Sequence, residues 1–237
     1  MPQALYVRKN AIRFAIAKGP KSGTSGNGKG RVKLLALGDS IIAGVGADNL
    51  SKALVGQIAY FLAKKLNRPV DWLACGKNGA DTYKITHSLA PQLVDEEANY
   101  IVLSTGVNDI TGLSRLNSWK NNLNSLLLTL VKSHPGAIIA VTGIPPLGEF
   151  PLLPQPLRAL FGLRGESFCQ VAQDLIDQHP SVIYIPLKFE TDPLMFSEDG
   201  FHPSEKGYEK IGEHMAQIMI ESANNKSIKT LALKGNK

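Results

Sequence analysis

The sequence has few cysteines, no long apolar run and no acidic residue near either end. Two cysteines, Cys75 and Cys169, occur among 237 residues, and neither lies near other residues at a metal-ligand spacing. We therefore expect two buried thiols, as in a reducing compartment, and no metal site. No stretch approaches the roughly 18 consecutive apolar residues that a membrane-spanning helix needs, so we expect no such helix.

Acidic residues are absent from residues 1–38 and 222–237, which hold eight and four Lys or Arg. Between them, residues 39–221 hold 14 basic and 20 acidic residues, so the net charge of +6 conceals an acidic body with basic ends. A nucleic-acid enzyme would carry positive charge on a folded face with a supporting motif, and the body has neither. We therefore expect no nucleic-acid partner.

The basic ends are expected to be solubilising tails. An open alternative is that residues 4–18, "ALYVRKNAIRFAIAK", form a basic amphipathic helix that makes weak contact with an anionic membrane surface. The N-terminal residues show neither the uninterrupted apolar core nor the small-residue cleavage site of a secretory signal. We therefore expect a cytoplasmic protein, peripheral to the membrane if this helix binds one.

Residues 19–30, "GPKSGTSGNGKG", are rich in Gly, Ser and Lys, which predicts a linker between the basic N-terminal segment and the body. Their Gly-x4-Gly-Lys spacing resembles a phosphate-binding loop. However, Gly30 stands where that loop needs Ser or Thr, and the segment precedes a strand instead of following one. We therefore reject a phosphate site and place the domain at residues 31–222, with a basic tail at 223–237.

Five short runs that are apolar on both faces predict strands of a covered parallel sheet. They span residues 34–37, 70–74, 100–103, 137–141 and 182–185. Apolar residues at helical spacing alternate with these runs, within residues 54–66, 116–130, 168–176 and 208–219. Alternating strands and helices predict one doubly wound α/β domain.

Polar residues with complementary chemistry follow four of the predicted strands. They are Asp39 and Ser40 after the first run, Asn78 and Gly79 after the second, Gly106, Asn108 and Asp109 after the third, and Asp199 and His202 after the fifth. Since ligands bind outside the carboxyl ends of parallel strands, we expect these residues at one edge of the sheet. A hydroxyl, a glycine amide, a carboxamide and an Asp/His pair are the groups that acyl transfer needs.

Each of these residues also has a local structural explanation. Ser40 could cap a turn, Gly79 could supply a positive φ, Asn108 and Asp109 could form an Asx turn, and His202 could precede a helix. Independent turn residues have no reason to occur in this order with complementary chemistry. Their combination therefore favours the functional interpretation.

The amino-acid sequences of these segments also resemble those of a known family. "ALGDSIIAGVG", "KNGADT", "STGVNDIT" and "DGFHPSEKGY" are similar to the four blocks of the SGNH, or GDSL, hydrolases, and the resemblance spans residues 34–221. The first block has Ile41 where the older family name expects Leu, at a position that varies and faces packing. The resemblance implies a flavodoxin-like, three-layer α/β/α fold with a five-stranded, mainly parallel sheet, and ester or thioester hydrolysis without a metal or other cofactor.

The family blocks map onto Ser40 as nucleophile, with His202 and Asp199 completing a triad. The residues support the same mechanism, because a serine needs a base to become nucleophilic and the base needs a carboxylate to orient it. The amides of Ser40 and Gly79 and the carboxamide of Asn108 would form the oxyanion hole.

Asp39 and Asp109 flank these residues. We expect both carboxylates to accept hydrogen bonds from backbone amides and fix the loops, and Asp39 to lie beside the bound substrate. A general-base role for such a carboxylate in a different scheme stays open.

The segment 142–165 contains five prolines and many apolar residues. It could pack as a loop on a neighbouring helix, or it could form a wall over an acyl group, with prolines limiting the entropy lost on ordering. In the second case the substrate contacts would include Leu147, Phe150 and Leu152, and short to medium acyl chains would be preferred.

The sequence thus predicts a serine esterase that hydrolyses small carboxylic esters. One alternative is an O-acetyl deacetylase of a carbohydrate that uses the same residues. Another is a non-catalytic binding module, which the presence of all the catalytic residue types disfavours.

Overall fold

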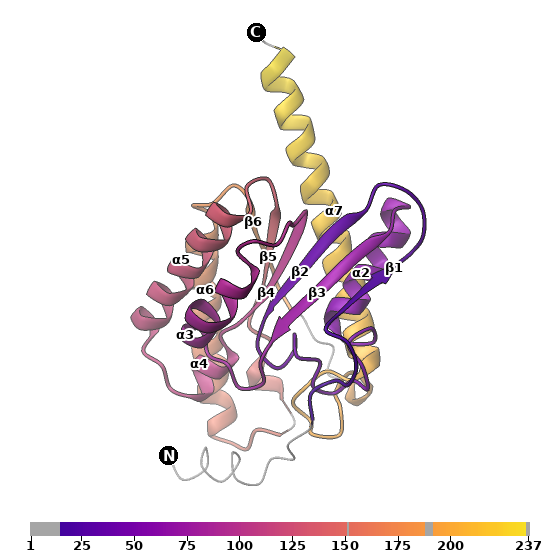
Figure 1. Cartoon of the computed structure of the whole chain (residues 1–237). Coiled ribbons are helices and arrows are strands. Elements are labelled where there is room, and N and C mark those ends of the chain that lie inside the picture. The colour runs from indigo at the N-terminus through magenta and orange to yellow at the C-terminus, as the bar shows by residue number, and fades with distance from the viewer. Residues whose placement is uncertain (1–14, 151, 188–191, 236–237) are drawn as a thin grey trace.

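The computed structural model describes residues 15–150, 152–187 and 192–235, with side chains placed up to residue 225. Within this part of the chain a central sheet contains six strands (Figure 1). They are β1 (Ser22–Ser25), β2 (Val32–Gly38), β3 (Val70–Gly76), β4 (Tyr100–Ser104), β5 (Ile138–Thr142) and β6 (Val182–Ile185). The spatial order is β1-β3-β2-β4-β5-β6.

The five predicted strands are confirmed, but the predicted number is one too low. The additional strand, β1, pairs antiparallel with β3 at the sheet edge and places Thr24 opposite Asp71. The two side chains are hydrogen-bonded, with 2.6 Å between Thr24 Oγ1 and Asp71 Oδ1. Since β1 is short, polar and incompletely buried, it has no apolar run by which the sequence could reveal it. The sheet therefore extends into the segment expected to be a linker.

The strands β3-β2-β4-β5-β6 are mutually parallel. Numbered along the chain, this is the flavodoxin-like order 2-1-3-4-5. The chain leaves β2 to form β3 on one side and then crosses to form β4 on the other. In such sheets the crevice for a ligand opens at this change of direction, beyond the carboxyl ends of the strands. Here that point is the end of β2, immediately before Ser40.

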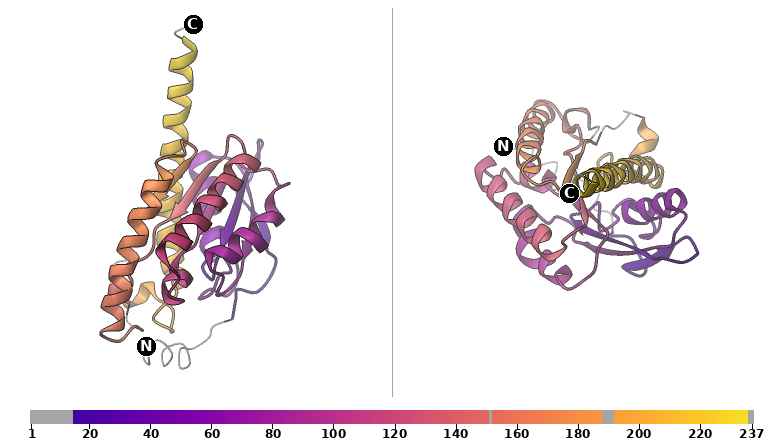
Figure 2. Two further views of the ribbon diagram at one scale, coloured as in Figure 1. Left: turned by 90° about the vertical axis from the view of Figure 1, so that its left-hand side faces the viewer. Right: turned by 90° about the horizontal axis from the view of Figure 1, so that it is seen from above.

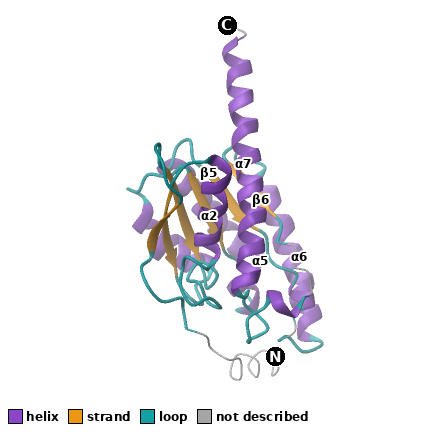
Figure 3. Ribbon diagram, turned by 90° about the vertical axis from the view of Figure 1, so that its right-hand side faces the viewer, coloured by secondary structure: helices purple, strands orange, loops and turns teal. Residues whose placement is uncertain are grey.

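Successive side chains of β2 enter two different cores. Leu34 and Ala36 pack with the helices α2 (Leu54–Leu66) and α7 (Glu205–Gly235), whereas Leu35 and Leu37 pack with α5 (Leu116–Ser133), α6 (Leu157–Ile176) and the helical segment after β3. Figures 2 and 3 show these helices on opposite faces of the sheet. The predicted three-layer α/β/α architecture is therefore confirmed. The other helical segments of the described residues are α3 (Thr82–Lys84), η1 (Ile85–Leu89), η2 (Ala90–Leu93), α4 (Val107–Thr111), η3 (Leu147–Glu149) and η4 (Pro193–Met195).

Two helices extend far beyond their predicted spans. Helix α6 begins at Leu157, so part of the proline-rich segment 142–165 is helical. Helix α7 continues to Gly235 through the residues expected to be a tail, and its last turns project away from the body (Figure 1). Both extensions lie outside the apolar stripes on which the predictions depended.

The structure describes the last four residues of the segment 4–18, for which the sequence left an amphipathic helix open. Residues 15–18 are not helical, and the amides of Ala17 and Lys18 donate to the carbonyl oxygens of Ala43 and Asp48 at 3.1 and 2.9 Å. Residues 4–14 lie outside the described residues. Among the described helices, none combines the length and apolar character that crossing a lipid bilayer requires.

Candidate active site

Ser40 lies in a tight turn at the carboxyl end of the central strand β2. The backbone turns immediately after the strand, because the amides of Ala43 and Val45 donate to the carbonyl oxygens of Asp39 and Ser40 at 3.0 Å each. This turn holds the Ser40 hydroxyl at the sheet edge that the strand order identifies as the ligand crevice.

His202 approaches Ser40 from the loop between η4 and α7. The distance between Ser40 Oγ and His202 Nε2 is 3.0 Å, and the distance between His202 Nδ1 and Asp199 Oδ2 is 2.6 Å. The carboxylate fixes the tautomer, so that Nδ1–H donates to Asp199 and Nε2 accepts from the serine hydroxyl. The structure therefore brings the three residues predicted as a triad into one hydrogen-bonded chain.

Asp199 is held as a carboxylate by its surroundings. Its Oδ1 accepts hydrogen bonds of 2.8 Å from the Ser197 hydroxyl and from the amides of Phe201 and His202. Burial alone would raise the pKa of Asp199, but the hydrogen bonds from the side chain and backbone of His202 lower it below its ordinary value. Ser197 was not among the site residues predicted from the sequence. The only signal was a serine two residues before an aspartate in a turn-rich segment.

Gly79 and Asn108 supply the other expected donors. Gly79 has φ of 73°, which explains why a glycine occupies this position. Asn108, in the first turn of α4, donates from Nδ2 to the carbonyl oxygen of Ala80 at 2.9 Å, which leaves the second N–H of the same amide available. No described residue accepts a hydrogen bond from the backbone N–H of Ser40 or Gly79. These loops therefore offer three donors that a ligand could use.

Asp109 joins the loops that carry Gly79 and Asn108. Its Oδ2 accepts from the amide of Thr82 at 2.9 Å and from the Thr82 hydroxyl at 2.7 Å. Burial raises the pKa of Asp109, and these hydrogen bonds oppose the shift. The geometry agrees with the loop-fixing role expected from the sequence.

Asp39 is buried beside the nucleophile, with 2% of its surface exposed. Its Oδ1 accepts hydrogen bonds of 3.2 Å from the amide of Ile41 and from the Ser104 hydroxyl. Burial raises the pKa of Asp39 to about 6, although these hydrogen bonds and the nearby His202 act in the opposite direction. Asp39 thus fixes the nucleophile turn, and its burial leaves no surface for the substrate contact that was also expected.

The expected acyl wall is largely part of the core. Leu147 and Phe150 are only 1% and 2% exposed, so they present no surface to a substrate in this structure. Phe150 packs edge-on against Phe201, with ring centroids 5.3 Å apart, and Phe201 packs in the same way on His202. Leu152 is half-buried, and its amide donates to the carbonyl oxygen of Gly200 at 3.4 Å. The segment therefore supports the histidine loop.

The two cysteines, Cys75 and Cys169, are both free and half-buried. Within the described ranges, no three His, Cys, Asp or Glu side chains gather closely enough to hold a metal ion.

The sequence of the chain is similar to those of known proteins. Residues 36–210 match the GDSL-like lipase/acylhydrolase family. A GDSL-like esterase from Mycobacterium tuberculosis is 30% identical over 185 residues, which cover 75% of this chain and 58% of that protein. The chain therefore spans less than two thirds of the length of this relative.

Solved structures with the same fold include two enzymes of different description. A lipase/acylhydrolase from Enterococcus faecalis matches with a TM-score of 0.60 and 22% identity, covering 82% of this chain and 96% of the other. A family 3 carbohydrate esterase from Clostridium thermocellum matches with a TM-score of 0.64 and 18% identity, covering 83% of this chain and 98% of the other. At these identities the likeness establishes the fold.

Proposed function

Because the chain belongs to the GDSL-like lipase/acylhydrolase family, we propose that it is a serine esterase that hydrolyses carboxylic esters of short to medium acyl groups. The observation that carries the proposal is the hydrogen-bonded chain from Ser40 through His202 to Asp199, with distances of 3.0 and 2.6 Å. A serine, a base and an orienting carboxylate at these distances are what nucleophilic catalysis at neutral pH requires.

The reaction begins with attack by Ser40 on the ester carbonyl. As the Ser40 oxygen bonds to the carbonyl carbon, His202 Nε2 takes the hydroxyl proton. Asp199 stabilises the imidazolium that forms, and its lowered pKa keeps it ionised for this role. The lone pair of the Ser40 hydroxyl thus becomes the new carbon–oxygen bond, and the carbonyl oxygen acquires a negative charge.

This negative charge needs hydrogen-bond donors that are already in place. The amides of Ser40 and Gly79, which have no acceptor among the described residues, supply two. The free N–H of the Asn108 carboxamide supplies a third, while its bond of 2.9 Å to the Ala80 oxygen holds the amide in position. Donors fixed in this way stabilise the transition state without reorganising during the reaction.

Collapse of the tetrahedral intermediate releases the alcohol and leaves the acyl group on Ser40. His202 returns its proton to the departing alkoxide oxygen and then takes a proton from the water that attacks the acyl-enzyme. The second collapse releases the carboxylic acid and restores the Ser40 hydroxyl. The cycle consumes one ester and one water and releases one alcohol and one carboxylic acid.

An O-acetyl deacetylase of a carbohydrate is the second candidate. Burial of Leu147 and Phe150 removes two of the three side chains expected to contact an acyl chain, and this favours a small acyl group such as acetyl. The same reactive residues would act in both cases.

Hydrolysis of p-nitrophenyl esters from acetate to dodecanoate, with the wild-type chain and Ser40→Ala, tests the proposal. We expect activity in the wild type that falls to background in the variant. A maximum beyond acetate but well short of dodecanoate would support the short-to-medium preference, whereas activity on acetate alone, with acetate release from acetylated glycans, would favour the deacetylase.

Labelling with a fluorophosphonate provides a test that does not depend on the choice of ester. The wild type should gain the mass of one phosphonyl group at Ser40, and Ser40→Ala should gain none. Equal labelling of the two proteins, or none in either with no ester hydrolysis, would leave the non-catalytic binding module as the better explanation.

A further inference from the structure

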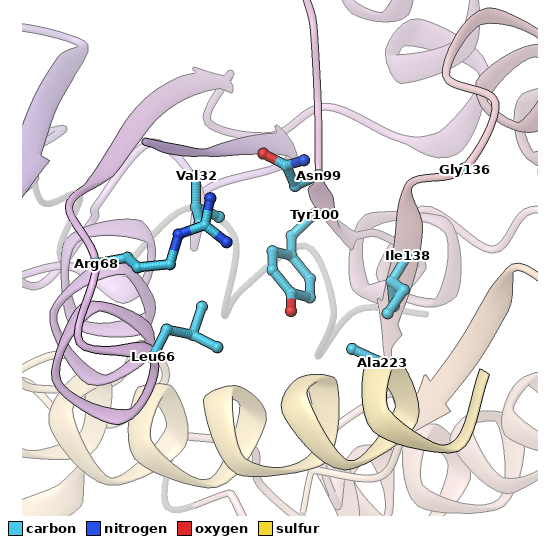
Figure 4. A pocket seen from close by; sticks show the side chains of 8 residues that line it. All are labelled: Val32, Leu66, Arg68, Asn99, Tyr100, Gly136, Ile138 and Ala223. Atoms are coloured by element: carbon cyan, nitrogen blue, oxygen red, sulfur yellow. The ribbon is translucent and has the colours of Figure 1, made fainter. Parts of the chain in front are cut away.

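A pocket of about 270 Å³ lies at the end of the sheet opposite to Ser40 (Figure 4). It is formed where the parallel strands begin, with lining from the starts of β2, β4 and β5, the end of α2 and one turn of α7. The seven residues of β2 separate it from the nucleophile turn, a distance of about 20 Å at the usual rise of a strand. The pocket is therefore distinct from the candidate active site.

Tyr100 presents an unused hydrogen-bond donor to this pocket. The residue is only 7% exposed, and Figure 4 shows its hydroxyl pointing into the space beneath the sheet. No described residue forms a hydrogen bond with this hydroxyl. Burial raises the pKa of Tyr100, so the phenol stays protonated, while the neighbouring Arg68 acts in the opposite direction. The hydroxyl oxygen itself is not among the buried side-chain atoms that lack a hydrogen-bond partner, so it reaches the open space of the pocket and can donate to a ligand or to water there.

Arg68 brings a positive charge to the same space. Its Nε donates to the carbonyl oxygen of Gly30 at 2.5 Å, which holds the guanidinium in place and leaves its terminal N–H groups directed toward the pocket (Figure 4). Asn99 also lines the pocket, and its Oδ1 accepts from the amide of Lys33 at 2.8 Å. Asn99 is therefore oriented with its own Nδ2 as the remaining donor.

The rest of the lining is apolar and carries no negative charge among the described residues. It consists of Val32, Leu66, Gly136, Ile138 and Ala223. A guanidinium and a hydroxyl match the two oxygens of a carboxylate, whereas a phosphate would leave further charged oxygens against apolar side chains at a cost. The volume lies just below the range of about 300–1,000 Å³ that holds drug-sized ligands, so we expect a smaller ligand.

We propose that this pocket binds a short-chain carboxylate, with its oxygens on Arg68 and Tyr100 and its alkyl chain against Leu66, Ile138 and Ala223. The site needs none of the residues assigned to ester hydrolysis, so binding here holds whether or not the chain is an esterase. If the chain is an esterase of short acyl groups, its own acid product belongs to the same chemical class as the ligand.

An isothermal calorimetric titration of the whole 237-residue chain with hexanoate tests the proposal. We expect one site whose dissociation constant rises about tenfold or more in Arg68→Gln, because a charge-assisted hydrogen bond is lost, and several-fold in Tyr100→Phe. Lys64→Gln is the matched control, since Lys64 is an exposed cation on α2 that does not line the pocket. Hexanamide, which has the same shape without the charge, should bind at least about tenfold more weakly than hexanoate.

Two results with hexanoate, and one with inorganic phosphate, would overturn the proposal. One is the absence of hexanoate binding to the wild type, or equal binding in the wild type, Arg68→Gln and Tyr100→Phe. The other is loss of binding after fluorophosphonate labelling of Ser40, which would place hexanoate in the active site. Inorganic phosphate binding as tightly as hexanoate would also contradict a carboxylate site. Because the Tyr100 hydroxyl has no hydrogen-bond partner in the part of the chain that the structure describes, Tyr100→Phe should fold normally and keep the comparison valid.

Discussion

The hydroxyl oxygen of Ser40 lies 3.0 Å from Nε2 of His202, although the two residues are 162 positions apart in the sequence. The loops that carry them are locked together. A side chain at Gly46, which follows the nucleophile turn, would overlap the carbonyl oxygen of Pro203, and Tyr208 donates from its hydroxyl to the carbonyl oxygen of Val45. The contact between nucleophile and base is therefore a consequence of how α7 packs against the end of β2.

The role of Asp199 predicts the effect of removing its charge. In Asp199→Asn we expect kcat on an ester to fall by about 10⁴, because the amide no longer holds the productive tautomer of His202 or stabilises its cation. Steady-state kinetics on p-nitrophenyl acetate measures the change. Glu198→Gln is the control, since Glu198 is the adjacent residue and is exposed. Equal kinetics of the two variants would remove Asp199 from the mechanism.

Asn108 should stabilise the transition state more than the bound substrate. We therefore expect Asn108→Ala to lower kcat by about 10²–10³ and leave KM nearly unchanged, as loss of one oxyanion donor does. Asn117→Ala, on the exposed face of α5, is the matched control. A change confined to KM would indicate that Asn108 binds the ground state and does not form part of an oxyanion hole.

Asp39 makes stability depend on pH in a direction unusual for a carboxylate. Burial raises the pKa of Asp39 from the ordinary 3.8 to about 6, so the folded state binds the proton more tightly than the unfolded state. The free energy of unfolding therefore falls as pH rises through this window. Since each pKa unit corresponds to about 1.4 kcal/mol, ionised Asp39 destabilises the folded state by about 3 kcal/mol above pH 6.

Asp39→Asn should remove this penalty while keeping an oxygen for Ile41 and Ser104. We expect the variant to be more stable than the wild type at pH 7, and the difference to vanish below about pH 4. Urea unfolding across this range measures it. Glu166→Gln, an exposed change on α6, should show no such pH dependence. A wild type more stable than Asp39→Asn at pH 7 would show that the charged form of Asp39 is stabilising.

The sequence predicted most of the features that depend on local pattern. Buried strands such as Tyr100–Ser104 are apolar on both faces, and polar residues at their ends are easily recognised. Edge strand β1 was missed because it pairs through its backbone and buries little. Phe150 was placed near the substrate because its apolar character is visible in the sequence. Its actual partner, Phe201, is known only once the fold brings the two segments together.

Phe150 provides the last prediction, because it distinguishes support of the histidine loop from contact with the acyl chain. Phe150→Ala should lower the free energy of unfolding by about 3–5 kcal/mol, as the loss of a buried aromatic ring does. Through Phe201 it should also loosen His202. We therefore expect kcat to fall by the same factor for every ester in a chain-length series, since the defect lies in the base and not in the acyl pocket.

The milder Phe150→Leu keeps the protein folded if the alanine variant does not fold, and it should show the same uniform effect at smaller size. Leu163→Ala, at a residue 64% exposed on α6, should change stability by less than about 0.5 kcal/mol and leave the series unaltered. A shift in the preferred acyl length in either Phe150 variant would instead show that Phe150 contacts the acyl group of the substrate. In that case the ring must leave its buried position when substrate binds.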